Sequence, residues 1–231
     1  MKVLGLIGGM SWESTKVYYE IINREVERRL GGFHSCECVI YSFDFHRIEA
    51  GQRENRWADL SAEMVEAALK LRSAGAELII ICTNTMHLMA DDIERESGIP
   101  LVHIADSVGH RINETGCKKV GLLGTEYTMT GEFLKDRLKM DHGLEIIIPP
   151  DEDRKLVHDV IFNELVKGII RGGSRDEYLR IIRDLDDRGA EGVILGCTEI
   201  PLLLDDTMTD IPLFDTTRIH AIDAVDKALG E

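Results

Sequence analysis

Two cysteines stand in matching contexts along the chain. Cys82 ends the run "IIIC" and is followed by Thr-Asn-Thr, while Cys197 ends "VILGC" and is followed by Thr-Glu. A pair of thiols on opposite sides of a carbon acid can move a proton in either direction, because one acts as thiolate base and the other as thiol acid. The matched pair therefore favours stereochemical inversion at a carbon next to a carboxylate.

An ordinary cysteine has a pKa near 8.5, so a thiolate at neutral pH needs help from its surroundings. Each cysteine precedes a predicted helix, whose N–H groups and dipole would favour the thiolate. Two interacting thiols would titrate as a coupled pair. The alternative is that each thiol is a small hydrophobic residue at a strand end, the commoner role for a single cysteine. Because Cys-Thr occurs in both matching segments, the sequence favours a catalytic role for the two cysteines over a packing role.

Small polar residues follow both cysteines. Thr83, Asn84 and Thr85, with Thr198, lie at the predicted helix starts, where they could cap the helix or bind a carboxylate. Thr125, in "GTEYTMTG", occupies the corresponding point of a later strand. Capping and ligand binding are compatible, and both stay open at this level.

Other polar residues near the cysteines allow two interpretations each. His87 could assist a thiol or hydrogen-bond the backbone, and Glu199 follows Cys197 by two residues. Glu164 and Lys167 are three apart on one helical face, which is typical of a surface ion pair but would also suit a substrate's amine and carboxylate. Residues 43–55 are polar and are expected to form a loop or lid from which Gln52 or Arg53 could reach a carboxylate.

The sequence predicts neither a nucleotide cofactor nor a metal. The early glycines do not have the spacing of the dinucleotide-binding fingerprint, and no phosphate-binding P-loop sequence occurs. The histidines show no paired ligand spacing, and Cys36 and Cys38 alternate onto one strand face, where packing is expected.

Composition is that of an ordinary globular protein, with 44% hydrophobic and 30% charged residues in 231. The net charge of −15 argues against nucleic acid or an anionic membrane as partner, because both require clustered basic residues. No apolar run approaches the roughly 20 residues that span a bilayer, and the start lacks a secretory signal, so a cytoplasmic location is expected.

Short apolar runs alternate with amphipathic ones, which predicts an α/β fold with parallel sheets. The expected strands are 2–7, 37–43, 77–82, 100–104, 119–123, 144–148, 192–196 and 211–214. The expected helices are 13–30, 56–73, 87–97, 105–115, 130–141, 152–170, 175–188, 199–205 and 216–229.

The chain also repeats itself. "SAGAELIIICTNT" aligns with "DRGAEGVILGCTEI", and "KVLGLIGG" resembles "KVGLLGT", with offsets of about half the chain. We therefore expect two similar α/β halves, 1–103 plus 208–231 and 104–207. Ligands of parallel sheets bind beyond the carboxyl ends of the strands, so an active-site cleft is expected between the domains.

The motifs "GLIGGMSWEST", "CTNTMH", "GLLGT" and "GCTEIP" resemble the aspartate/glutamate racemase superfamily, in its aspartate and broad amino-acid racemase branch. The resemblance implies two pseudo-symmetric Rossmann-like domains with the site between them, often in a homodimer, and proton transfer at Cα by Cys82 and Cys197 without pyridoxal phosphate or metal. It also implies substrate contacts, listed here with the less firmly placed charged pair last: Met10, Gln52, Thr83, Asn84, Thr85, Thr125, Thr198, Glu164 and Lys167.

The leading hypothesis is a racemase that interconverts L- and D-aspartate, and perhaps acts on glutamate, a small acidic amino acid in either case. Retention of both cysteines favours racemisation, since some relatives keep one. A maleate-type cis–trans isomerase of the same superfamily would instead attack a double bond with one thiolate. A non-enzymatic module that binds a small acid is the third hypothesis, and it requires neither cysteine.

Overall fold

A computed structural model describes residues 1–230, and the chain forms two compact units. Unit 1 comprises 1–103 and the chain from His220 onward, and unit 2 comprises 104–219. Each unit is an α/β structure around a parallel sheet, which confirms the expected fold class. The expected first domain included 208–219, but a strand in this segment pairs with the second sheet and so belongs to unit 2.

Unit 1 has a three-stranded sheet of β1 (Leu4–Gly8), β2 (Cys38–Ser42) and β3 (Leu78–Ile81), in the order β2-β1-β3. Leu101 adds a single parallel bridge to Ile79, beyond β3. The expected strand at 100–104 is therefore reduced to one bridge, because the next helix already begins at Ile104.

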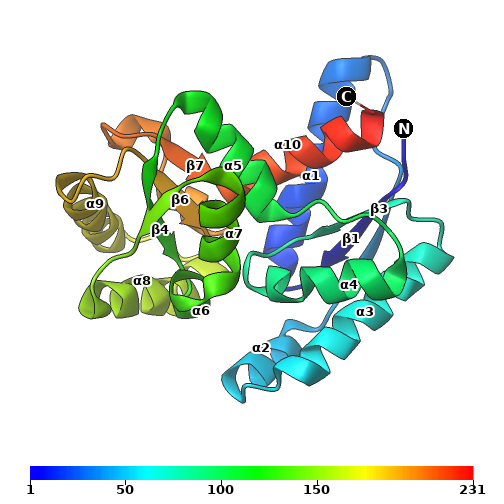
Figure 1. The fold of residues 1–231 in the computed structure, drawn as a ribbon, viewed down its shortest axis with the longest axis horizontal. Coiled ribbons are helices and arrows are strands. Elements are labelled where there is room, and N and C mark those ends of the chain that lie inside the picture. The colour runs from blue at the N-terminus through cyan, green and yellow to red at the C-terminus, as the bar shows by residue number, and fades with distance from the viewer. Residues whose placement is uncertain (231) are drawn as a thin grey trace. The chain divides into compact units, whose positions relative to one another are not determined.

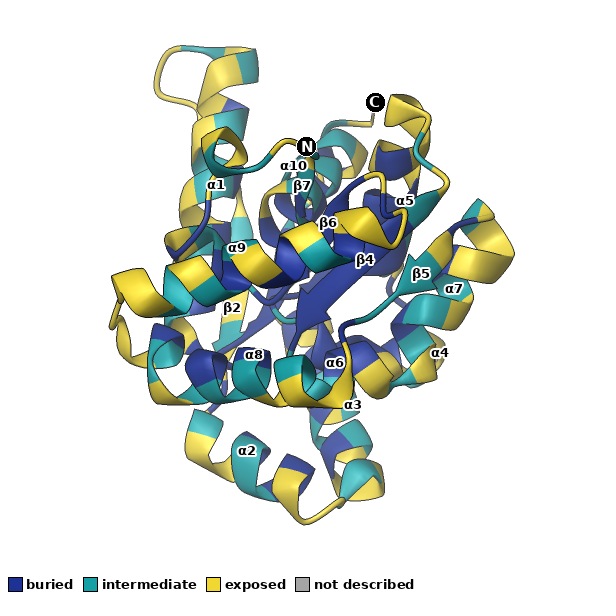
Figure 2. Cartoon of the chain, turned by 90° about the vertical axis from the view of Figure 1, so that its left-hand side faces the viewer, coloured by how far each residue is buried: buried dark blue, intermediate teal, exposed yellow. Residues whose placement is uncertain are grey.

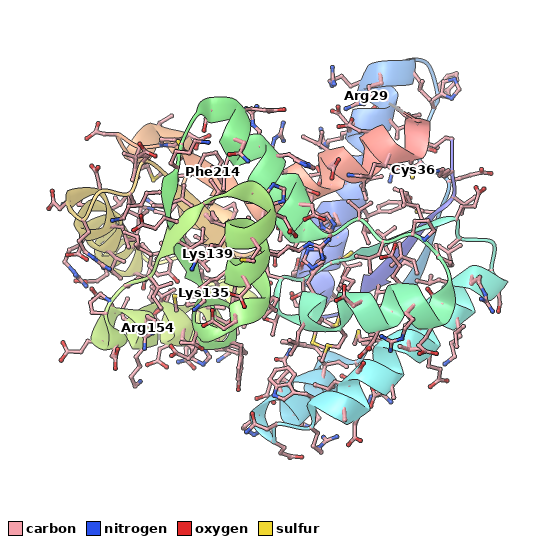
Figure 3. All side chains as sticks on the ribbon, viewed as in Figure 1. Arg29, Cys36, Lys135, Lys139, Arg154 and Phe214 are labelled. Carbon is pink, nitrogen blue, oxygen red and sulfur yellow. The ribbon has the colours of Figure 1, made fainter. Side chains whose placement is uncertain are left out.

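Helices cover both faces of this sheet. In unit 1 they are α1 (Trp12–Leu30), α2 (Phe45–Arg53), α3 (Trp57–Ser73), the 3₁₀ helix η1 (Thr85–Met89), α4 (Ala90–Ser97) and most of α10 (Thr216–Leu229). Helices α1 and α10 lie side by side (Figure 1). Arg29 of α1 reaches Asp226 of α10 in an ion pair (Figure 3).

Alternation along the strands divides the core of unit 1 into two clusters. Ile7, Ile79 and Ile81 pack with residues of α3 and α4, while Ile80 and Cys82 pack with residues of α1 and α10. Successive side chains of a strand point to opposite faces, which explains this division. Cys36 lies in the second cluster with Cys38 packed against it, as expected for packing residues.

Unit 2 repeats the strand order of unit 1. Its sheet is β5-β4-β6-β7, built from β4 (Lys119–Gly124), β5 (Glu145–Ile147), β6 (Val193–Gly196) and β7 (Leu213–Asp215). The central strands β1 and β4 correspond, β3 corresponds to β6, and the bridge at Leu101 takes the place of β7. This shared topology supports the internal repeat.

The central strands β4 and β6 of unit 2 are buried beneath amphipathic helices, as their dark colour and the yellow outer helix faces in Figure 2 show. Phe214 of β7 extends the core to the sheet edge (Figure 3). The helices are α5 (Ile104–Thr115), α6 (Glu126–Thr130), α7 (Glu132–His142), α8 (Asp151–Asn163), η2 (Leu165–Lys167), α9 (Gly172–Asp187), η3 (Ile200–Leu202) and η4 (Asp206–Met208).

Three expected elements differ from the structure. The expected loop at 43–55 contains α2, because Asp44 caps the first turn and Ile48 is buried. The expected helix at 152–170 ends at Asn163 and continues only as η2, which stops at the left-handed Gly168. The expected helix at 199–205 is the short η3.

No helix within residues 1–230 is long and apolar enough to cross a membrane.

A cluster of three buried histidines lies in the core of unit 1. His220 is fully buried; its Nε2–H donates to the Val102 carbonyl at 2.8 Å, so its Nδ1 accepts from the Tyr18 hydroxyl at 2.9 Å. The His87 ring lies 5.3 Å from that of His220 and 4.8 Å from that of His103. Burial lowers the pKa of His220 to about 4 and the pKa of His87 well below its usual value.

These depressed pKa values predict acid lability of unit 1. The unfolded chain takes up a proton near pH 6.5 and the folded His220 near pH 4, so stability is complete above pH 6.5 and falls below it. We expect His220→Gln to lower the free energy of unfolding at pH 7 by about 1–3 kcal/mol, through lost hydrogen bonds. Between pH 7 and pH 5 it should lose about 2 kcal/mol less than the wild type.

Urea unfolding followed by tryptophan fluorescence measures this effect, since both tryptophans, Trp12 and Trp57, belong to unit 1. The exposed His34→Gln serves as control. Equal pH dependence in the wild type and His220→Gln would show that His220 does not titrate as its burial requires.

Close packing at Gly8 fixes the entry into α1. A Cβ at this position would lie 2.5 Å from both Cγ2 and Oγ1 of Thr15. Thr15 Oγ1 also accepts the Gly9 N–H at 2.8 Å and donates to the Ser11 carbonyl at 3.0 Å. Any larger residue would therefore displace the side chain that joins β1 to α1.

We expect Gly8→Ala to destabilise the protein by about 1–3 kcal/mol, the usual cost of overpacking. Gly172→Ala is the matched control, because an added Cβ there meets nothing within 4 Å. Thermal unfolding monitored by circular dichroism compares the two, and a Gly8→Ala melting temperature equal to that of the wild type would refute the close-packing account.

Candidate active site

Cys82 follows β3 directly and is fully buried. Its N–H donates to the Ile7 carbonyl at 2.9 Å, and its carbonyl accepts from Ser14 Oγ at 2.8 Å. The sheet and α1 therefore hold the main chain of Cys82 on both sides. Burial raises the pKa of the Cys82 thiol, and the nearby charge of a Cys38 thiolate would raise it further.

The turn after Cys82 is anchored by His87. His87 Nδ1–H donates to the Thr83 carbonyl at 2.8 Å, and the His87 N–H donates to the Asn84 carbonyl at 3.1 Å. Because a trans peptide directs its carbonyl and its N–H to opposite sides, the N–H groups of Asn84 and Thr85 point away from His87. Of the two roles open for His87, the structure supports the hydrogen bond to the backbone.

Met10 and Gln52 reach the same edge of the sheet from other elements. Met10 follows β1, whose end pairs with the end of β3, and it is buried. Gln52 lies on the buried face of α2, and its Nε2 donates to Met86 Sδ at 3.3 Å, within the turn after Cys82. The candidate residues of unit 1 thus gather where β1 and β3 end.

Cys197 forms a hydrogen-bonded group with its two following residues. Cys197 Sγ donates to Glu199 Oε2 at 3.0 Å, and Thr198 Oγ1 donates to the same oxygen at 2.7 Å. Cys197 and Glu199 are buried, with exposed fractions of 8% and 5%. Burial, followed by the charge of Glu199, raises the pKa of the Cys197 thiol well above its usual value.

Thr125 lies beside this group, since Gly124 at the end of β4 pairs with Gly196 at the end of β6. Thr125 caps α6, because its Oγ1 accepts the Thr128 N–H at 3.3 Å. The same hydroxyl lies 3.2 Å from Thr128 Oγ1. Thr125 therefore caps α6. This capping is compatible with the ligand-binding role that the sequence also suggested.

Glu164 and Lys167 do not form the ion pair that their spacing suggested. Glu164 Oε2 accepts from Ser174 Oγ at 2.6 Å, and Glu164 Oε1 lies 3.5 Å from Arg171 Nη1. Lys167 ends the short η2 helix and is exposed. The two residues differ in setting, and the structure ties only Glu164 into unit 2.

The expected lowering of the thiol pKa by helix dipoles is not what the structure gives. The helices after the two cysteines are 3₁₀ turns of five and three residues, so their dipoles are small. Burial dominates instead and raises both pKa values.

Sequence reasoning did not predict the polar contacts of Ser14, His220 and Glu199. Ser14 and His220 are distant in sequence from the residues they touch, and no local signal marks them. Glu199, by contrast, was visible beside Cys197, and a carboxylate two residues from a thiol could have been read as its partner. Within residues 1–230, no three His, Cys, Asp or Glu side chains are grouped so as to hold a metal ion.

Comparisons with known proteins give a family match and similar solved structures. The Asp/Glu/hydantoin racemase family matches residues 7–224. A candidate Asp/Glu racemase of Yersinia pestis is 51% identical, with a TM-score of 0.94 over 99% of this chain and 100% of its own. An aspartate racemase homologue of Pyrococcus horikoshii is 37% identical, with a TM-score of 0.85 over 99% and 100%.

A broad-specificity amino-acid racemase of Bacillus subtilis is 22% identical over 99% of each chain. The family match extends over nearly the whole chain, from β1 to α10, and includes both cysteine motifs. The chain belongs to the Asp/Glu/hydantoin racemase family.

Proposed function

We propose that the protein is a cofactor-independent amino-acid racemase that interconverts L- and D-aspartate, with glutamate as a further substrate. Membership of the racemase family makes it an isomerase-class enzyme. The observation that carries the proposal is the equivalence of Cys82 and Cys197, each placed directly after the corresponding strand of a repeated sheet. The 37% identical relative described as an aspartate racemase homologue supports aspartate over other amino acids.

In the proposed mechanism Cys82 and Cys197 act on the same α-carbon of the substrate. One cysteine, as thiolate, removes the α-proton, and the other, as thiol, donates a proton to the opposite face of the carbanion. The reverse direction exchanges the two roles. Since the substrate's carboxylate must bind beside the reacting carbon, we assign its contacts to the residues at the strand ends and on α2: Met10, Gln52, Thr83, Asn84, Thr85, Thr125 and Thr198.

Glu164 and Lys167 are assigned to the substrate's amino group and a carboxylate. The carboxylate of Glu164 is suited to an ammonium group, and its contact with Ser174 would hold it in place. The ammonium of exposed Lys167 is free to swing towards a bound anion. The proposal includes a cytoplasmic homodimer that needs neither pyridoxal phosphate nor metal, as the family resemblance implies.

The deciding experiment is incubation of the protein with L-aspartate in D₂O without added cofactor. Loss of the Cα–H signal by NMR and loss of optical rotation should proceed together. Exchange with glutamate but not aspartate would reassign the substrate. Turnover of maleate without exchange of any amino acid would replace the proposal by a cis–trans isomerase, and binding of acids without turnover would replace it by a binding module.

Removal of either thiol should separate exchange from inversion. We expect Cys82→Ala and Cys197→Ala each to lower racemisation by about 10²–10⁴-fold, the usual contribution of a general acid or base. The remaining thiol can only remove and return a proton on its own face. Each variant should therefore wash deuterium into one enantiomer, and the two variants should select opposite enantiomers.

Cys117→Ala is the matched control, since this half-buried thiol donates to the Glu191 carbonyl at 3.5 Å and otherwise packs against the apolar core of unit 2. Chiral chromatography combined with NMR gives both readouts. Unchanged racemisation in both single variants would eliminate the two-thiol mechanism.

A further inference from the structure

The turn that carries Thr125 is held by a side chain from another helix of unit 2. The N–H of Glu126, the residue after Thr125, donates to His158 Nδ1 of α8 at 3.2 Å. The Thr125 carbonyl accepts the N–H groups of Thr128 and Met129 at 3.0 and 2.9 Å. Both sides of the planar peptide group that joins Thr125 to Glu126 are therefore fixed, and this plane cannot turn without breaking one of these contacts.

Unit 1 anchors the corresponding turn in a different way. Gly9 follows β1 as Thr125 follows β4, and its N–H donates to Thr15 Oγ1 of the next helix, α1. Helix α1 has 19 residues and supplies this anchor itself, whereas α6 has only five. A helix as short as α6 is not stable by itself, so the turn before it depends on an anchor from α8.

Neighbouring rings and the hydrogen bond define the state of His158. Its ring centroid lies 6.3 Å from that of Tyr127 on α6 and 4.7 Å from that of Phe162 on α8. A ring nitrogen that accepts a backbone N–H carries no proton, so the proton of the neutral ring lies on Nε2. Protonation of Nδ1 would turn the acceptor into a donor, and two N–H groups would then face one another.

We propose that His158 is a positioning residue for the substrate's carboxylate, and that it acts by holding the peptide between Thr125 and Glu126 so that Thr125 is presented to the ligand. This inference rests on the proposed function, which assigns Thr125 to that carboxylate. His158 touches no reacting atom in this role. The neutral ring is the active form, because only the neutral ring can accept the Glu126 N–H.

The charged groups around His158 leave its ring neutral at pH 7. Burial, the largest influence, lowers the pKa of His158 below its usual value. Asp159 of α8 and Glu126 of α6 act in the opposite direction, and Lys155 of α8 lowers the pKa further. Arg154 of α8 lies 3.4 Å from Glu126 Oε1 and partly neutralises that carboxylate. The ring therefore becomes protonated only below a pH of about 6.5.

The first test is hydrogen exchange of the Glu126 amide in the full-length protein without substrate, followed by NMR. His158→Leu removes the acceptor, whereas His158→Asn places an amide oxygen close to the position of Nδ1, since both atoms are bonded to Cγ. At constant pH we expect exchange to be about 2–10-fold faster in His158→Leu, the range for one net hydrogen bond. Exchange in His158→Asn should remain close to that of the wild type.

The kinetics of aspartate racemisation give the second readout. We expect His158→Leu to raise KM by about 2–10-fold with kcat unchanged, because the thiols are not altered, and His158→Asn to restore KM. Between pH 7 and pH 5 the wild-type KM should rise relative to that of His158→Asn, since only the wild type loses its acceptor on protonation. Effects of acid elsewhere are common to both proteins and cancel in this ratio.

His110→Asn is the control, because it replaces an exposed histidine of α5 in the same unit. It should match the wild type in Glu126 exchange, in KM and in the pH dependence of KM.

Long-range proton–nitrogen NMR decides the question in the wild type even where His158→Leu does not fold, and an Nδ1–H tautomer of His158 at pH 7 would overturn the proposal. Equal Glu126 exchange in the wild type and His158→Leu would also overturn it, as would faster exchange without a change in KM. Faster exchange in a protein that racemises no amino acid would support the anchoring of the turn while refuting the proposed function, so the two failures are distinguishable.

Discussion

A thiolate at the end of a buried parallel strand is costly, and this cost governs the arrangement around both cysteines. The strands β3 and β6 are apolar on both faces because helices cover both sides of a parallel sheet. A residue placed directly after such a strand inherits that burial. The pKa values of Cys82 and Cys197 are raised for this reason, and a thiolate at either position would form only where its surroundings offset the penalty.

The two cysteines have different surroundings. Unit 2 places the Glu199 carboxylate against Cys197, whose thiol donates a hydrogen bond to it. Unit 1 fixes the main chain instead: Ile7 and Ser14 hold Cys82, and His87 directs two carbonyls inward so that the next N–H groups point away. Backbone dipoles of this kind are preorganised, so they can favour an anion without themselves taking up a proton.

Burial also determines the charge of the histidines in unit 1. His87 and His220 are kept uncharged by burial, and their hydrogen bonds define which nitrogen carries the proton. A charged imidazolium in the core would cost unit 1 its stability. The cluster therefore serves as a rigid support for the turn after Cys82, and the price is sensitivity of the fold to acid.

Most strands and helices were predictable from the sequence, and the predictions that were wrong have physical causes. Strands were predictable because continuous apolar runs such as "IIIC" and "VILG" are short and end at polar residues. Helix α2 was mistaken for a loop because its buried face is a few residues wide, with Ile48, Gly51 and Gln52 among polar neighbours. The contact of His220 with Tyr18 joins residues 202 positions apart, and no local pattern encodes such a pair.

The internal repeat was predictable from the sequence. The residues that differ between its two halves are more informative than the residues that match. Two halves that needed identical bases would be expected to keep identical neighbours, yet Cys-Thr is followed by Asn84 in one half and by Glu199 in the other. An amide can only donate or accept a hydrogen bond, whereas a carboxylate can also hold a proton. The two thiols therefore have unequal surroundings. The proposed racemisation would need one base and one acid at each moment, and an unequal pair of thiols would suit that need without two thiolates at once.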